Sequence, residues 1–134
     1  MTTFRAALVG FASFIVLASS ALAANVLDTA SKTALQAGMQ QFIERSTVNG
    51  VYLHLDLASG NLRSLHPVNA HPMILRMGEN FVLCGSFRDA KGNTIPVDYY
   101  MTKRGNRYIV FQAEVENRDA LHKLMDAGKV VQAD

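Results

Sequence analysis

The fold is decided by residues 73–115, which read MILRMGENFVLCGSFRDAKGNTIPVDYYMTKRGNRYIVFQAEV. Four runs rich in apolar residues alternate here with short turn sequences such as Gly78-Glu79-Asn80 and Lys103-Arg104-Gly105-Asn106. Because short connections join antiparallel neighbours, the segment predicts a meander with strands at 73–77, 81–88, 94–102 and 107–115. Pro96 cannot donate a hydrogen bond to a ladder, so its strand is expected at an edge of the sheet or to begin after it.

Alternate residues of a strand point to opposite faces of the sheet. Taking every second residue assigns one face to Met73, Leu75, Met77, Phe81, Leu83, Phe87, Ile95, Val97, Tyr99, Met101, Ile109, Phe111, Ala113 and Val115. The opposite face then receives Val82, Cys84, Tyr100, Tyr108 and Val110, and it is less polar than a solvent-facing surface. We therefore expect it to be covered by a helix of the same chain or by a partner protein.

Two helices are expected to flank the strands. Residues 31–46 carry an apolar stripe on one helical face, formed by Leu35, Met39, Phe42 and Ile43, and Asp28, Thr29 or Ser31 can cap the start. The polar face is rich in glutamine rather than basic residues, which favours core packing over membrane binding. Residues 118–127 predict a short second helix between Asn117 and Gly128, with Leu121, Leu124 and Met125 on one side.

The stretch between the first helix and the meander begins with residues 51–57, which read VYLHLDL. Valine and leucine alternate strictly with tyrosine, histidine and aspartate, which predicts a half-buried strand with its leucines on the core side. Residues 62–65 are expected to form a short returning strand. The following segment, 66–72, contains two prolines and is expected to be irregular.

These elements predict a single α+β domain, in which an N-terminal amphipathic helix packs on a curved antiparallel sheet of about four to six strands and a short helix follows. The order of the elements resembles the cystatin-like and nuclear-transport-factor-2-like architectures. The resemblance is confined to element order, because the inhibitory glycine and the Gln-Val-Gly loop of true cystatins are absent. It therefore implies a fold and no function.

Residues 1–23 have the zones of a cleavable signal peptide: Arg5, an apolar run over 6–17, and the small residues Ala21 and Ala23. The apolar run is shorter than the roughly 20 residues that span a bilayer as a helix. We expect cleavage after Ala23 and a periplasmic or secreted domain of residues 24–134 with no stable membrane anchor. No cofactor is expected.

Charge and cysteine content narrow the classes further. The chain has 13 Lys and Arg against 11 Asp and Glu, scattered without a basic run, so nucleic acid is not an expected partner. Cys84 is the only cysteine, which excludes an internal disulfide, and its apolar neighbours predict a buried, unreactive thiol. The sequence also lacks a nucleophile elbow, phosphate-binding glycine loops, His-Glu-x-x-His and Cys-x-x-Cys.

The nearest approach to a catalytic set is a scattered group. His54 and Asp56 share one strand face, while His71 and Asp98 come from later segments. Imidazole and carboxylate groups of this kind form acid/base pairs, and His54, His66 and His71 are the corresponding candidate metal ligands. A soft-metal site at His71, Met73 and Met77 is a weaker alternative. Solvated strand side chains explain the same pattern more simply.

The sequence favours a non-enzymatic binding or interaction module whose ligand it does not specify. Its expected interaction surface is the second sheet face, with Tyr52, Tyr100, Tyr108 and Val110, facing a protein partner or a second copy. Two alternatives stay open: a metal-assisted or acid/base enzyme using His54, Asp56 and His71, and a structural accessory protein of the cell envelope. Convergence of the candidate residues in a concave pocket would favour the enzyme.

Overall fold

The computed structural model describes residues 26–133, so the expected signal peptide over residues 1–23 lies outside the described residues. In chain order the elements are α1 (Thr29–Ser46), β1 (Thr47–Val48), β2 (Val51–Asp56), β3 (Asn61–Pro67), β4 (Met73–Met77), β5 (Asn80–Arg88), β6 (Thr94–Arg104), β7 (Arg107–Val115), α2 (Arg118–Asp126) and β8 (Val131–Gln132). The structure confirms the α+β class predicted from the sequence. The sheet has eight strands because the two-residue strands β1 and β8 add to those expected.

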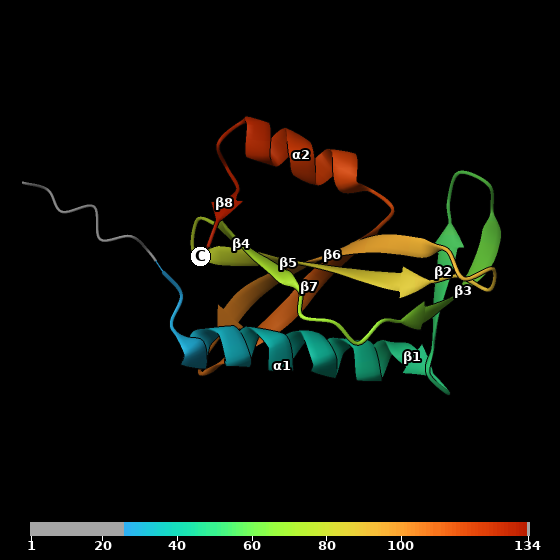
Figure 1. Cartoon of the computed structure of the whole chain (residues 1–134), viewed down its shortest axis with the longest axis horizontal. Coiled ribbons are helices and arrows are strands. Elements are labelled where there is room, and N and C mark those ends of the chain that lie inside the picture. The colour runs from blue at the N-terminus through green and yellow to red at the C-terminus, as the bar shows by residue number, and fades with distance from the viewer. Residues whose placement is uncertain (1–25, 134) are drawn as a thin grey trace, which may run out of the picture.

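The centre of the sheet is β5, and all its pairings are antiparallel. One edge of β5 pairs with β6, which in turn pairs with β7. The other edge is divided: β4 pairs with residues 80–84 and β3 pairs with Phe87 and Arg88. Because β3 continues outward to β2, the β2–β3 hairpin leaves the main sheet at one end (Figure 1).

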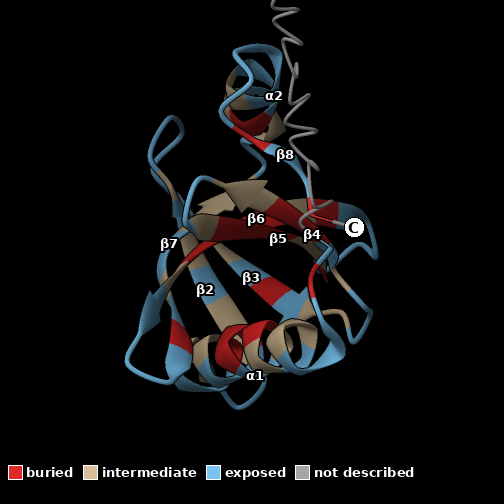
Figure 2. Ribbon diagram, turned by 90° about the vertical axis from the view of Figure 1, so that its left-hand side faces the viewer, coloured by how far each residue is buried: buried red, intermediate tan, exposed pale blue. Residues whose placement is uncertain are grey.

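The main sheet lies between the two helices, with α1 on one face and α2 on the other (Figure 2). The larger core cluster lies under α1 and joins its Leu35, Met39 and Ile43 to strand residues that include Leu83, Phe87, Val97, Tyr99 and Met101. The smaller cluster lies under α2 and contains Leu75, Val82, Tyr100, Leu121 and Val130. The predicted core role of the α1 stripe is thus confirmed. No helix within residues 26–133 has the length and apolar character needed to cross a bilayer.

The start of α1 and its seat on the sheet both have local causes. Asp28 is the cap, because its carboxylate accepts a hydrogen bond of 2.6 Å from the backbone N–H of Ser31. Gly38 lies directly on β7: a Cβ atom at this position would be 2.3 Å from the carbonyl oxygen of Tyr108. The absence of a side chain at Gly38 therefore allows α1 to approach the strand this closely.

The second sheet face is covered by α2, which was one of the two covers expected. Leu121 is fully buried there and Leu124 packs against the same cluster, whereas Met125 is exposed. Asn117 occupies the N-cap position but donates its side-chain amide to Glu114 instead of capping the helix, and Gly128 ends the helix with φ 69°.

The face assignment of β4 was wrong by one residue. Ile74 belongs to the cluster under α1, while Leu75 and Met77 pack under α2 and Met73 is exposed. The cause is the register with β5, which sets Ile74 opposite Leu83 and Leu75 opposite Val82. Cross-strand partners share a face, so β5 determines the orientation of β4.

The face assignment of β7 was wrong over its first half because of a β-bulge. Tyr100 pairs with Gln112 and Met101 pairs with Val110, so Phe111 is an extra residue without a partner. Ala113 and Val115 face α1 as expected, but beyond the bulge Tyr108 and Val110 face α1, and Ile109 and Phe111 are exposed.

The placement expected for Pro96 was also wrong, because it lies inside β6 opposite Ser86. The ladder with β7 begins only at Val97, which pairs with Val115. Beyond that point the carbonyl of Pro96 accepts a hydrogen bond of 2.9 Å from the N–H of Glu116. Pro96 has no N–H to donate, and the side of β6 to which that N–H would point lies beyond the end of β7 at this position.

Candidate functional site

The most unusual surface of the described chain is an apolar face on the outer side of the β1–β3 strands. Leu53 and Leu55 of β2 are 52% and 50% exposed, and Leu62, the cross-strand partner of Leu55, is 64% exposed. Val48 of β1 and Leu57, just beyond β2, reach 67% and 87%. We refer to these five residues as the leucine face. Large apolar side chains gathered on one surface typically mark an interaction site.

The leucines of β2 were expected to face the core, and this prediction was wrong. The side chains that face inward are instead those of Tyr52, His54 and Asp56. Tyr52 stacks on Phe87 with ring centroids 4.9 Å apart, and Leu65, the cross-strand partner of Tyr52, is fully buried. The aromatic pair and Leu65 attach the base of the hairpin to the core under α1, which turns the leucines outward.

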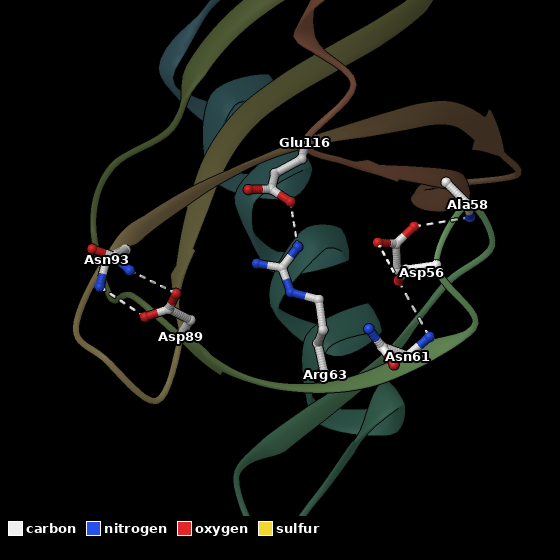
Figure 3. Close-up of polar contacts among 8 residues, drawn as sticks. Asp56, Ala58, Asn61, Arg63, Asp89, Asn93 and Glu116 are labelled. Atoms are coloured by element: carbon white, nitrogen blue, oxygen red, sulfur yellow. Dashed lines mark hydrogen bonds and ion pairs between the residues drawn. The ribbon is translucent and has the colours of Figure 1, made fainter.

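An ion pair holds the inner side of the hairpin to the end of β7. Figure 3 shows the Arg63 side chain extending from β3 to the carboxylate of Glu116. The hydrogen bond to Glu116, followed by the charges of Glu116, Asp89 and Asp56, raises the pKa of Arg63. Arg63 is thus a polar anchor between segments that are far apart in the sequence.

Glu116 reaches Arg63 from an uncommon backbone conformation. Its φ of 54° lies in the left-handed region, which residues with a Cβ atom rarely adopt outside Asn and Asp. The conformation follows directly on the end of β7, where the Glu116 N–H binds the Pro96 carbonyl. The turn of the chain at this point is therefore fixed by one backbone hydrogen bond and one ion pair.

The residues expected to form a catalytic set have separate local roles. Asp56 organises the β2–β3 turn, accepting hydrogen bonds from the Ser59 hydroxyl and the Ala58 N–H, which lower the pKa of the carboxyl (Figure 3). His54 is half-buried opposite Arg63. Hydrogen bonds from Asn117 and Gln112 lower the pKa of Glu114, and the charge of His54 lowers it further. His54 and Asp56 therefore serve the hairpin and its junction with β7.

Asp98 lies on the other side of the main sheet. It is 1% exposed, its Oδ2 accepts a hydrogen bond of 3.0 Å from Nε of Arg118 in α2, and its Oδ1 lies 3.0 Å from Nη2 of the same guanidinium without hydrogen-bond geometry. Cys84 is its cross-strand partner, and burial followed by the charge of Asp98 raises the pKa of the thiol to about 12. The sequence predicted a buried, unreactive thiol at Cys84; the raised pKa agrees with low reactivity, but the residue is only half-buried. The pairing between Asp98 and Arg118 was not predicted.

His66 and His71 complete the set of candidate ligands. His66 is exposed near the end of β3, in register with Arg88. His71 lies in the connection between β3 and β4, where it lines two cavities of about 730 and 240 Å³. The larger lies between that connection and α1, and the smaller extends to Cys84, Tyr99 and Arg118. Of the four residues expected to form the catalytic set, only His71 lines these cavities.

No metal centre is assembled from the candidate ligands. Within residues 26–133, no three His, Cys, Asp or Glu side chains are grouped as metal ligands. For the soft-metal alternative, Met73 lines the smaller cavity with His71, but Met77 packs under α2. At about 3.3 Å per residue, the strand separates the two methionines by roughly 13 Å, which is too far for one ion.

The tyrosine surface expected from the sequence divides between two places. Tyr100 is buried under α2, whereas Tyr52, Tyr108 and Val110 pack with the cluster under α1. These four residues therefore do not share a face, and the leucine face replaces them as the candidate interaction surface. No protein-family model matches the chain, and neither the curated proteins nor the solved structures give a match to it.

Proposed function

We propose that this protein is a small, exported, non-enzymatic binding module that recognises a protein partner through the leucine face. The observation that carries the proposal is the orientation of the hairpin. Four aliphatic side chains between 50% and 67% exposed share the outer side of the paired strands, and Leu57, 87% exposed, lies in the adjoining turn, while Arg63 and Asp56 occupy the inner side. Such an arrangement leaves apolar surface in water that a partner can cover.

The size of the leucine face suits reversible binding. Its five side chains present on the order of 500 Å² of apolar surface, worth on the order of 10 kcal/mol when buried. Association costs about 4–15 kcal/mol in lost motional freedom, so only part of this gain appears as affinity. A partner is therefore expected to bind and dissociate readily.

The roles of the other candidate residues also support binding over catalysis. The Asp56 carboxylate is engaged by its own turn, and Asp98 is engaged by Arg118 on the far side of the sheet. An acid/base mechanism needs groups within hydrogen-bond reach of one substrate, and these two carboxylates serve different parts of the fold. Export is the part of the proposal that depends on residues 1–23 alone.

A capture experiment tests this function with a matched control. The exported protein is immobilised, exposed to envelope extract and compared with Leu55→Lys and Phe111→Lys. Phe111 is as exposed as Leu53, at 52%, but lies on β7, which pairs with β6 and not with β1, β2 or β3. We expect Leu55→Lys to abolish capture and Phe111→Lys to retain it. Equal capture by both variants would exclude the leucine face as the binding surface.

A further inference from the structure

We propose that the partner bound by the leucine face is a second copy of this chain, packed face to face about a two-fold axis. This inference rests on the proposed function and names the partner. In an isologous interface the same surface is used by both copies, so that surface must be complementary to itself. The charge, size and shape of the leucine face each bear on that requirement.

The leucine face carries no formal charge. Between Thr47 and Leu62 the acidic and basic residues are His54 and Asp56, and both belong to the inner side of the hairpin, where Asp56 is held by the Ser59 hydroxyl and the Ala58 N–H. Arg63 is directed inward to Glu116. Two copies can therefore approach without like-charge repulsion, whereas a strongly charged partner finds no complementary group. An anionic membrane surface also finds none of the lysines and arginines that usually attract it.

The area is sufficient for a weak dimer. Two leucine faces of on the order of 500 Å² each bury on the order of 1,000 Å² in total, which is the lower limit for a specific interface. Interfaces of this size are typical of transient complexes, so we expect a dissociation constant in the micromolar range.

The hairpin also has a suitable shape. Leu55 and Leu62 are direct cross-strand partners, and Leu53 lies two residues away on the same side of β2. Side chains of paired strands form a continuous surface, and two such surfaces pack about 10 Å apart in face-to-face sheets. Leu55 and Leu62 are therefore expected at the centre of the dimer.

Sedimentation of the exported protein across a range of concentrations tests the proposal. We expect a reversible monomer–dimer equilibrium that Leu55→Lys weakens at least about tenfold. Leu62→Lys is a second variant at the partner position, and Phe111→Lys is the exposed control. Circular dichroism verifies that each variant is folded. A dimer that persists undiminished in both folded leucine variants would overturn the proposal, whatever the Phe111→Lys control shows.

Cross-linking by an introduced cysteine provides a second readout. Leu53→Cys should be joined into a dimer by a bismaleimide reagent long enough to span two packed sheets, and Phe111→Cys should not. The native Cys84 is a suitable background because burial, followed by the charge of Asp98, raises the pKa of its thiol. Failure of Leu53→Cys to cross-link while the control does so would contradict face-to-face packing.

The same variants separate this proposal from the proposed function. A wild-type protein that remains monomeric at every concentration overturns the second copy as partner. If Leu55→Lys still abolishes capture from envelope extract while Phe111→Lys does not, the interaction function stands with a different partner. If neither dimerisation nor capture depends on Leu55, both proposals are wrong.

Discussion

Arg63 and Glu116 lie 53 residues apart in the sequence, and the guanidinium of the first donates a hydrogen bond to the carboxylate of the second. The contact joins the β2–β3 hairpin to the end of β7, at the point where Glu116 adopts a left-handed conformation. Together with Tyr52 and Leu65 at the base of the hairpin, it fixes which side of the hairpin faces outward. The leucine face is thus a consequence of contacts on the opposite side of the same strands.

The first prediction compares two substitutions of Glu116. Glu116→Gln removes the ion pair and should lower the free energy of unfolding by at most about 1 kcal/mol, since the pair is partly exposed and screened by solvent. Glu116→Gly removes the same pair but also relieves left-handed strain of about 1 kcal/mol. Urea unfolding should therefore find the glycine variant more stable than the glutamine variant. A glutamine variant more stable than the glycine variant would contradict the backbone strain assigned to Glu116.

The second prediction concerns the contact between α1 and β7. Gly38→Ala should raise helix propensity, yet the new methyl group would clash with the Tyr108 carbonyl oxygen, 2.3 Å from the ideal Cβ position. We expect a net loss of about 1–3 kcal/mol in the free energy of unfolding. Ala37→Gly is a control for propensity, since it lowers helix propensity without adding a side chain. A Gly38→Ala variant more stable than the native protein would show that α1 can shift freely.

The third prediction tests the cover provided by α2. Leu121 is 1% exposed and packs on Val82 and Tyr100, so Leu121→Ala should destabilise the protein by about 2–5 kcal/mol. Met125 lies on the same helix but is 40% exposed, and Met125→Ala should change stability by less than about 0.5 kcal/mol. Thermal unfolding of the pair measures the difference. Equal effects would mean that α2 does not cover this face.

The parts of the fold that sequence predicted correctly are those with uninterrupted strand pairing. The faces of β5 and β6 were assigned correctly, because each strand keeps its alternation through a regular ladder from Phe81 to Arg88. In β7 the bulge at Phe111 reverses the alternation, and no glycine marks the position. In β4 the register with β5 decides which side chains face α1. Register depends on two strands, so the sequence of β4 alone does not determine its faces.

The candidate site was missed for a related reason. Alternation in β2 groups Leu53 with Leu55 and Tyr52 with His54, but it does not say which group faces the core. That choice depends on Phe87 and Glu116, whose positions near the hairpin follow from the whole topology. The absence of Asp, Glu, Lys and Arg from Thr47 to Leu55 was visible in the sequence, and it was compatible with either orientation.

The fourth prediction concerns processing of the N-terminus, which lies outside the described residues. Ala21 and Ala23 fit the small-residue pattern of a signal-peptide cleavage site, so the exported protein should begin at Ala24. Intact-mass analysis of protein recovered from the envelope or the medium measures this directly. Replacing Ala23 with a bulky residue, as in Ala23→Phe, should slow cleavage. A recovered protein that retains residues 1–17 would contradict export by a cleaved peptide.

The last prediction uses the ionisation of Cys84. Burial, followed by the charge of Asp98, raises the pKa of its thiol from 9.0 to about 12, so the folded state favours the neutral thiol. Its contribution to stability is therefore fully present below pH 9 and is lost as the pH rises through the folded pKa. Cys84→Ser removes this titration, since serine does not ionise in that range. Buried tyrosines lose stability in the same alkaline window, and comparison of the native and serine proteins cancels their common contribution. We expect the difference in unfolding free energy between the two proteins to narrow between about pH 9 and pH 12.

Alkylation gives an independent measure, because iodoacetamide reacts with the thiolate and should modify Cys84 at pH 8 only after unfolding. Rapid alkylation of the folded protein at that pH would show that the thiol is accessible and ionised, and would contradict the raised pKa of Cys84.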